Sequence, residues 1–279
     1  MTDDSTAAYG EPAPAGEART AIDTTVPHSA RIWNYWLGGK DNYPVDREAG
    51  DAYAKMFPGV VDIALASRHF LIRTIRYLAE EVGIRDFLDI GTGLPTVDNT
   101  HQVAQRVAPE CRIVYVDNDP LVLAHASALL TSSREGATDY IHADIRDPDT
   151  ILAKAAKTLD FTKPVGLILS GILGHIIDTG EARAIVHRLM AGLPSGSYLS
   201  LNDGTNIIAG DALEQAQEDY NESGAMPYVH RTPAEIASFF DGLELVEPGV
   251  VSCPLWRPEA TPFGSPRKVD AFGGVARKP

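Results

Sequence analysis

The stretch FLDIGTGLPT, residues 87–96, decides how the rest of this 279-residue sequence is interpreted. A short apolar run, typical of a buried strand, contains Asp89 near its end and passes into Gly91 and Gly93. Because glycine has no Cβ, the backbone at these two positions can turn sharply and approach a ligand closely. The stretch therefore predicts a strand, a ligand-binding loop and the start of a helix. A plain tight turn fits the same residues, since a lone pair of glycines is a weak signal.

Apolar runs and helical patterns alternate downstream of this loop. Runs typical of strands lie at residues 87–91, 113–117, 138–144, 165–170 and 197–202, and helical patterns lie at 97–107, 121–130, 150–159 and 181–193. Strands that are almost wholly apolar are covered on both faces by helices, which predicts a doubly wound, mostly parallel α/β sheet. Two further helices are expected at 211–221 and 232–240. The runs 243–251 and 269–278 have no helix between them, so we expect an antiparallel hairpin at the sheet edge.

Three parts of the chain are expected. Residues 1–26 are poor in large aliphatic side chains and predict a disordered tail. Residues 27–83 predict a helical extension, with a short helix and tight loop in 29–46 and helices at 47–56 and 60–82. Residues 84–279 form the ligand-binding domain. No internal repeat is visible.

Composition narrows the classes of function. The formal net charge of -14 opposes the phosphate backbone of nucleic acids, and no run of Lys and Arg offers a local basic patch. The two cysteines, Cys111 and Cys253, have no metal-binding spacing and are expected to be buried thiols in a reducing compartment. No stretch is long and apolar enough to span a bilayer, so a cytoplasmic protein without membrane contact is expected.

Acidic residues at the strand ends suggest what the loop binds. Asp89 would repel a pyrophosphate but suits the ammonium group of an amino-acid-bearing cofactor, which favours S-adenosylmethionine over a dinucleotide. Asp117 stands 24 positions after Gly93, a distance typical of a ribose ligand. Asp144 is suited to an adenine amino group, with Ile145 packing on the ring. Alternatively, Asp117 only caps the next helix.

Two other acids are better explained as caps. Asp119 precedes Pro120, and an acid followed by proline is typical of the first residues of a helix. Asp147, which precedes Pro148, is interpreted as a turn or cap residue in the same way.

The ordered segments LDIGTG, VYVDND, HADIRD and LSGILGHI resemble the motifs of class I S-adenosylmethionine-dependent methyltransferases. More specifically, ARIWNYWLGGKDNYPVDR followed by FLDIGTGLPT resembles the actinobacterial S-adenosyl methyltransferase family, formerly a domain of unknown function. The resemblance spans about residues 28–278 and implies a seven-stranded sheet. It implies that Gly91 and Gly93 border the methionine portion of the cofactor. Asn118 and Ser170 complete the expected cofactor-binding set, and Pro95 departs from the usual third glycine of the loop.

The same resemblance implies an acceptor pocket beside Ser170 and His175. His175 is the candidate catalytic base, with a structural role at the start of a helix as the alternative. Residues 31–46 are expected to form a lid in which Trp33, Tyr35 and Trp36 supply the apolar inner face and Arg31, Lys40 and Asn42 lie nearby. Packing of these aromatic rings on the main core is the alternative.

Three functions fit these residues. The first is methyl transfer from S-adenosylmethionine to a small-molecule acceptor, which the sequence does not identify. The second is a non-catalytic S-adenosylmethionine-binding or regulatory protein. The third is an NAD-dependent oxidoreductase, which explains Gly91, Gly93 and Asp117 but neither Asp89 nor the helix-free terminal hairpin. No metal-binding, P-loop or serine hydrolase motif is present.

Overall fold

The computed structural model describes residues 23–122, 125, 131–259 and 264–279. Its centre is one mixed sheet with the strand order β3-β2-β1-β4-β5-β8-β6, and β7 also pairs with β8. Strands β1 to β5 run parallel, whereas β8 runs antiparallel to β5. The strands are β1 Asp86–Ile90, β2 Arg112–Asp117, β3 Ala137–His142, β4 Val165–Ser170, β5 Tyr198–Gly204, β6 Glu244–Leu245, β7 Val251–Ser252 and β8 Ala271–Arg277.

Helices cover both faces of this sheet, which explains why its strands are so apolar. One face packs against α3 (Val60–Tyr77) and α4 (Thr100–Val107). The other face packs against α6 (Pro148–Ala155), α7 (Thr179–Ala191) and α9 (Pro233–Ser238). Along β2, Ile113 and Tyr115 belong to the first core, and Val114 and Val116 to the second. The predicted doubly wound α/β fold is confirmed.

The helix starts follow from local hydrogen bonds. The side chain of Asp147 accepts from the backbone N–H of Thr150 at the start of α6. Asp119 accepts from the N–H of Leu121 in the same way, so both acids are caps as predicted. Of the helix expected at 121–130, residues 123–124 and 126–130 lie outside the described residues.

The final sheet edge differs from the prediction of one strand over 243–251. Two short strands lie there instead, β6 opposite Arg277 and Ala276, and β7 opposite Gly273 and Phe272. A turn closed by the Gly249 N–H and the Val246 carbonyl interrupts the run. Together β6 and β7 fill one position beyond β8, so the sheet has seven positions and ends in the expected antiparallel arrangement.

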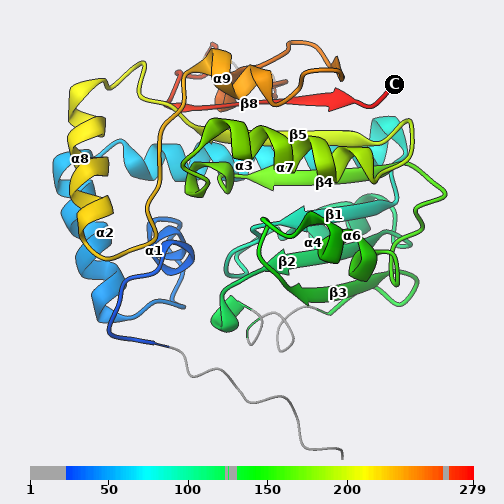
Figure 1. The fold of residues 1–279 in the computed structure, drawn as a ribbon, viewed down its shortest axis with the longest axis horizontal. Coiled ribbons are helices and arrows are strands. Elements are labelled where there is room, and N and C mark those ends of the chain that lie inside the picture. Colours follow the sequence, from blue (N-terminus) through cyan, green and yellow to red (C-terminus); the bar gives the residue numbers. More distant parts are fainter. Residues whose placement is uncertain (1–22, 123–124, 126–130, 260–263) are drawn as a thin grey trace, which may run out of the picture.

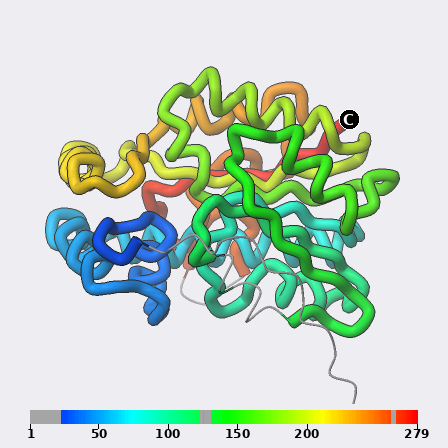
Figure 2. The backbone as a smooth tube through the Cα atoms, turned by 60° about the horizontal axis from the view of Figure 1, so that its bottom comes forward, coloured from blue at the N-terminus to red at the C-terminus, as the bar shows by residue number. Residues whose placement is uncertain are grey.

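The N-terminal helices divide into two groups. Helix α3 continues into the π-helical turn η1 (Leu78–Val82), and its Phe70 and Ile75 are fully buried in the sheet's first core. Helices α1 (Ser29–Trp36) and α2 (Pro44–Met56) contact each other, and α2 contacts α8 (Asp211–Glu222); both α1 and α2 also contact α3. This group lies beyond the carboxyl ends of the parallel strands, at the left of Figure 1 and again in the turned view of Figure 2.

The predicted disordered tail falls mostly outside the described residues, which begin at residue 23. Residues 23–26 form a bent segment. The buried guanidinium of Arg31 holds it through bonds to the carbonyl oxygens of Asp23 and Val26. Within the described part of the chain, no helix is long and apolar enough to cross a membrane.

Candidate functional site

A cavity lies where the carboxyl ends of the parallel strands face α1, α2 and α8. Ligands of open α/β sheets bind at this edge. The nine site residues predicted from the sequence all line this cavity: Asp89, Gly91, Gly93, Asp117, Asn118, Asp144, Ile145, Ser170 and His175. The structure thus brings the predicted set together, from strands that are far apart along the chain.

The glycine loop after β1 has the backbone that the sequence suggested. Gly91 has φ +74° and Gly93 has φ +65°, in the left-handed region that favours glycine. A Cβ on Gly91 would lie 2.6 Å from the Ile172 side chain, whereas a Cβ on Gly93 would meet nothing within 4 Å. Gly91 is therefore required by packing as well as by φ, and the space beside Gly93 is open.

Asp117 joins the loop after β2 to the glycine loop. Its Oδ2 accepts from the Gly93 N–H at 2.8 Å, and its Oδ1 accepts from the Asp119 N–H at 2.9 Å. Burial raises the pKa of this carboxyl, while the two backbone bonds act in the opposite direction. Asp117 therefore organises the backbone here, and each carboxylate oxygen still has a lone pair for a ligand hydroxyl.

Opposite charges meet at the first strand. Asp89 accepts a hydrogen bond from the Thr100 hydroxyl, and burial raises its pKa to about 6, a rise that Thr100 and the charge of Arg68 oppose. Arg68, on α3, donates to the Val97 carbonyl at 2.8 Å and also lines the cavity. The sequence analysis missed Arg68, because helical periodicity places its neighbours in the core but does not show where its own side chain points.

The third strand supplies a more open part of the wall. Asp144 is half exposed, accepts from the Arg146 N–H, and lies 3.5 Å from the Arg146 guanidinium. Ile145 is buried beside it, 7% exposed. Asn118 is exposed, and its carbonyl oxygen lies 3.1 Å from His142 Nε2. These residues form a rim with one apolar side chain and several hydrogen-bonding groups.

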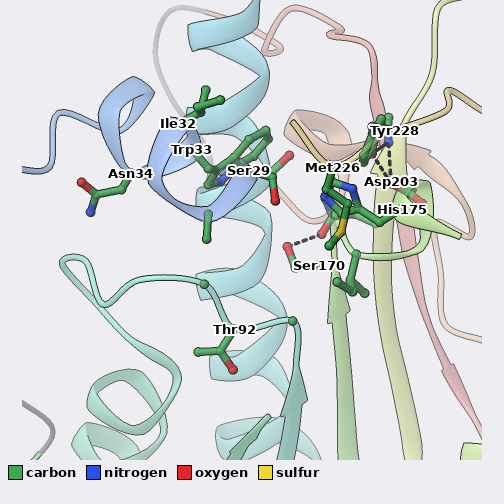
Figure 3. Close-up of a pocket in the computed structure, with 18 of the residues that line it drawn as sticks. Ser29, Ile32, Trp33, Asn34, Thr92, Ser170, His175, Asp203, Met226 and Tyr228 are labelled. Atoms are coloured by element: carbon green, nitrogen blue, oxygen red, sulfur yellow. Dashed lines mark hydrogen bonds between the residues drawn. The ribbon is translucent and has the colours of Figure 1, made fainter. Parts of the chain in front are cut away.

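His175 lines the cavity and belongs to the short 3-10 helix η2 (Leu173–His175) after β4. Its Nδ1 is 2.9 Å from the Pro227 carbonyl oxygen, which can only accept, so Nδ1 carries the proton. Burial lowers the pKa of the imidazole. The neutral form therefore has an unprotonated Nε2. Ser170 donates to Asn202 Oδ1 at 2.8 Å (Figure 3).

A buried acid at the end of β5 was also missed by the sequence analysis. Asp203 lines the cavity, and its Oδ1 accepts from the Tyr228 hydroxyl and from the Gly204 N–H. Its Oδ2 has no hydrogen-bond donor, with the nearest Arg231 nitrogen at 3.7 Å. Burial raises the pKa of Asp203 to about 6. A single Asp at a strand end gives no signal in the sequence, because its partners come from residues 228–231.

The N-terminal helix α1 forms one wall of the cavity. Trp33 and Trp36 line it, and Figure 3 shows Trp33 on one side with His175, Met226 and Tyr228 on the other. Tyr35 does not line it; its hydroxyl donates to Asp51 at 2.7 Å on the outer side. The inclusion of Tyr35 in the apolar inner face is therefore wrong, since successive residues of a helix point in different directions.

The polar residues of the same segment have structural contacts. Arg31 forms a buried ion pair with Asp46, Asn42 donates to Asn34 Oδ1, and Lys40 is exposed. None of Arg31, Lys40 and Asn42 lines the cavity. Asn34 accepts from the Asp41 N–H as well and thus fixes the Gly-Gly turn.

Helix α1 also reaches the far side of the cavity. His28 Nδ1, at the start of α1, lies 3.2 Å from Asp119 Oδ2 in the loop after β2. Ala30 and Tyr43 pack against Leu94, Leu121 and Val122. The cavity is consequently covered from the first strand to the second by residues 28–43.

Aromatic rings continue from α1 away from the glycine loop. Trp33 contacts Trp36, Trp36 contacts Tyr53, and Tyr53 contacts Tyr220, with ring centroids 5.9, 5.3 and 5.9 Å apart. All four line the cavity. We call the part bounded by these rings and by Asp203, Tyr228 and His230 the aromatic chamber. In the described ranges, no group of three His, Cys, Asp or Glu residues has the arrangement of a metal site.

Comparison with known proteins identifies the family. The family model described as S-adenosyl methyltransferase matches residues 15–279. A solved structure of a DUF574 family protein from Streptomyces avermitilis is 47% identical, with a TM-score of 0.89, over 93% of this chain and 100% of that one. A candidate methyltransferase from Thermobifida fusca is 38% identical, with a TM-score of 0.83, over 92% and 96% of the two chains. No curated protein matches the chain.

S-adenosylmethionine is the cofactor of the family that was matched. Neither a dinucleotide oxidoreductase nor a non-catalytic binding protein is supported by these comparisons. The chain belongs to the S-adenosyl methyltransferase family and is an S-adenosylmethionine-dependent methyltransferase.

Proposed function

We propose that this enzyme methylates a small molecule enclosed between the sheet and α1, with the cofactor held along the carboxyl ends of β1 to β4. One observation carries the proposal. The cavity has a pair of opposite charges, a neutral histidine and an aromatic chamber. S-adenosylmethionine would supply the methyl group on its sulfonium.

The charged pair fits an amino acid. Asp89 and Arg68 both line the cavity, and we propose that Asp89 accepts from the ammonium group and Arg68 donates to the carboxylate. A ligand carrying both groups pairs with both side chains at once. A pyrophosphate would meet Asp89 with like charge, which supports the methionine portion of the cofactor here.

The loops after β2 and β3 suit the nucleoside. We propose that Asp117 accepts the ribose hydroxyls, with Asn118 beside it, and that Asp144 accepts from the adenine amino group while Ile145 packs on the ring. Asp117→Ala should weaken S-adenosylmethionine binding by about 1.5 to 3 kcal/mol, roughly ten- to a hundred-fold, because charge-assisted bonds are lost. Calorimetry measures the dissociation constant. An unchanged constant in a folded variant would limit Asp117 to its backbone bonds.

We propose that His175 takes a proton from the acceptor. Its neutral form has a free Nε2, and the bond from Nδ1 to Pro227 fixes the orientation of the ring. His175→Asn keeps a polar side chain but removes the titrating group. We expect a lower turnover number and a cofactor dissociation constant within about threefold of the wild type, a difference below ~1 kcal/mol. Full turnover in the variant would refute the base.

The acidic charge argues against nucleic acid as the acceptor. Among the described residues that line the cavity, five are aspartates and two are arginines. A phosphate backbone entering such a cavity would meet repulsion at close range, in addition to the net charge of -14 on the whole chain. We therefore propose a small-molecule acceptor and no nucleic-acid or membrane partner.

A further inference from the structure

The aromatic chamber is not used by any proposed cofactor contact, and its wall carries acidic side chains. Asp203 and Asp270 line it, whereas the two arginines among the described lining residues are held elsewhere: Arg68 donates to the Val97 carbonyl, and Arg146 donates to the His175 carbonyl. Arg231 lies behind Asp203 and donates to the carbonyl oxygens of Leu173 and Ile176. An anionic acceptor in the chamber would thus lie beside two carboxylates, while the nearest cation, Arg231, is buried 3.7 Å behind Asp203 Oδ2.

Two buried polar atoms in the chamber have no hydrogen-bond partner, although each lies within 4 Å of an ionisable side chain. Asp203 is 1% exposed and its Oδ2 has no donor, although Oδ1 has two. His230 Nδ1 is buried without a hydrogen bond, 3.9 Å from Glu214. Burying a carboxylate oxygen without a hydrogen-bond donor costs free energy. A ligand that supplies the missing donor removes this cost and therefore binds more tightly.

The rings opposite favour a cation as well. The faces of Trp and Tyr carry negative electrostatic potential and attract ammonium groups within about 6 Å. Tyr228 connects Asp203 with the two histidines. Its hydroxyl donates to Asp203, and its ring centroid lies 5.1 Å from that of His175 and 5.8 Å from that of His230. The ammonium group of a ligand would therefore lie near both the carboxylate of Asp203 and the imidazole of His175.

We propose that the acceptor is an aromatic amine-bearing compound whose ring lies against Trp33, Trp36, Tyr53 and Tyr220 and whose amino group is drawn toward Asp203; this inference rests on the proposed function. The amine enters as an ammonium and gives one proton to Nε2 of His175. Its free electron pair then forms the N–C bond while the C–S bond of the cofactor breaks, with that bond's electrons remaining on sulfur. The product is the N-methyl ammonium.

Three probes that differ only in the head group test this class: 2-phenylethylamine, 2-phenylethanol and phenylacetate. Their binding to the full chain is measured by calorimetry with saturating S-adenosylhomocysteine, whose own binding is measured first. We expect the amine to bind at least tenfold more tightly than the alcohol and the carboxylate to bind weakest. With S-adenosylmethionine, mass spectrometry should show methyl addition to the amine alone. Equal binding of amine and alcohol, or no binding of any probe, overturns the proposal.

Asp203→Asn should reduce the preference for amine over alcohol at least tenfold. Asp62→Asn, an exposed acid on α3, is the matched control and should leave the preference unchanged. If Asp203→Asn does not fold, the binding of the three probes to the wild type still tests whether the acceptor is an amine. Failure to bind S-adenosylhomocysteine at all would refute the proposed function, whereas normal binding of it with no preference for the amine refutes only this inference.

Discussion

At the scale of single residues, the strongest functional features are carboxylates kept in unfavourable surroundings. Burial raises the pKa of Asp89 and of Asp203 to about 6, although each has bonds that favour its charged form. Natural proteins keep such groups where a ligand uses the charge, since a buried charge costs stability. In Asp89 that charge faces the proposed ammonium site.

Asp89→Asn should stabilise the ligand-free protein while removing cofactor binding. The pKa of Asp89 is higher in the folded protein than the unfolded value of 3.8. The wild-type side chain therefore contributes to the free energy of unfolding below about pH 4, and this contribution is lost as the pH rises through 6. The variant should gain about 1 to 3 kcal/mol at pH 7.5 relative to the wild type and little at pH 4. Urea unfolding at the two pH values measures the difference.

The same shift sets the pH dependence of binding. Because an ammonium group pairs only with the ionised carboxylate, the affinity of the wild type for S-adenosylmethionine should fall as the pH drops below 6. Equal gains in stability at both pH values, or unaltered cofactor binding by Asp89→Asn, would contradict the role of Asp89.

At the scale of elements, α1 forms one wall of the cavity. Trp33 and Tyr35 are two positions apart on this helix, yet one lines the cavity and the other bonds to Asp51 on its outer side. Deleting the whole segment would be a poor test of a lid. Ile32 is 1% exposed and Arg31 is paired with Asp46 in the interior, so the deletion would also damage the fold.

Trp33→Ala and Tyr35→Ala make a cleaner pair. Removing the Trp33 ring opens the wall opposite His175, so we expect turnover to fall at least tenfold, equivalent to about 1.4 kcal/mol in the barrier. Tyr35→Ala should retain turnover within about twofold. Steady-state kinetics on both variants, with circular dichroism as a check of folding, decide the matter. Similar losses in the two variants would mean that α1 acts only through stability.

At the scale of the whole molecule, the site lies between the sheet and the group of α1, α2 and α8, which share one hydrophobic core. The glycine loop and strand ends belong to the sheet, whereas Trp33 and Tyr220 belong to the group of α1, α2 and α8. A ligand in the cavity touches both the sheet and this group. Its binding energy therefore contributes to the docking of that group on the sheet.

Hydrogen exchange should reveal this coupling. We expect S-adenosylhomocysteine to slow amide exchange in the loop at residues 91–94 and also in α1, because residues 28–43 span the cavity between the first two strands. At a ligand concentration of 100 times the dissociation constant, stabilisation should reach about 2.7 kcal/mol. Protection confined to the glycine loop would show that the helical group closes independently of the ligand.

The sequence alone was sufficient for features that depend on neighbours along the chain. Apolar runs predicted the five parallel strands, glycines with an acid before them predicted the loop after β1, and Asp before Pro predicted the helix starts at 119 and 147. Because parallel strands end at one sheet edge, these local patterns also indicated that Asp89, Asp117 and Asp144 would meet.

Tertiary structure alone decided which side chains complete the cavity. Arg68 and Asp203 are ordinary residues in a helix and at a strand end, and only packing brings one to Asp89 and the other to Tyr228. The same holds for Trp33 and Tyr35, whose roles differ because the helix turns about 100° per residue while its orientation is set by contacts with α2 and α3. Local patterns determine where the chain turns and what it buries, whereas the direction of a single side chain depends on contacts with residues far along the sequence.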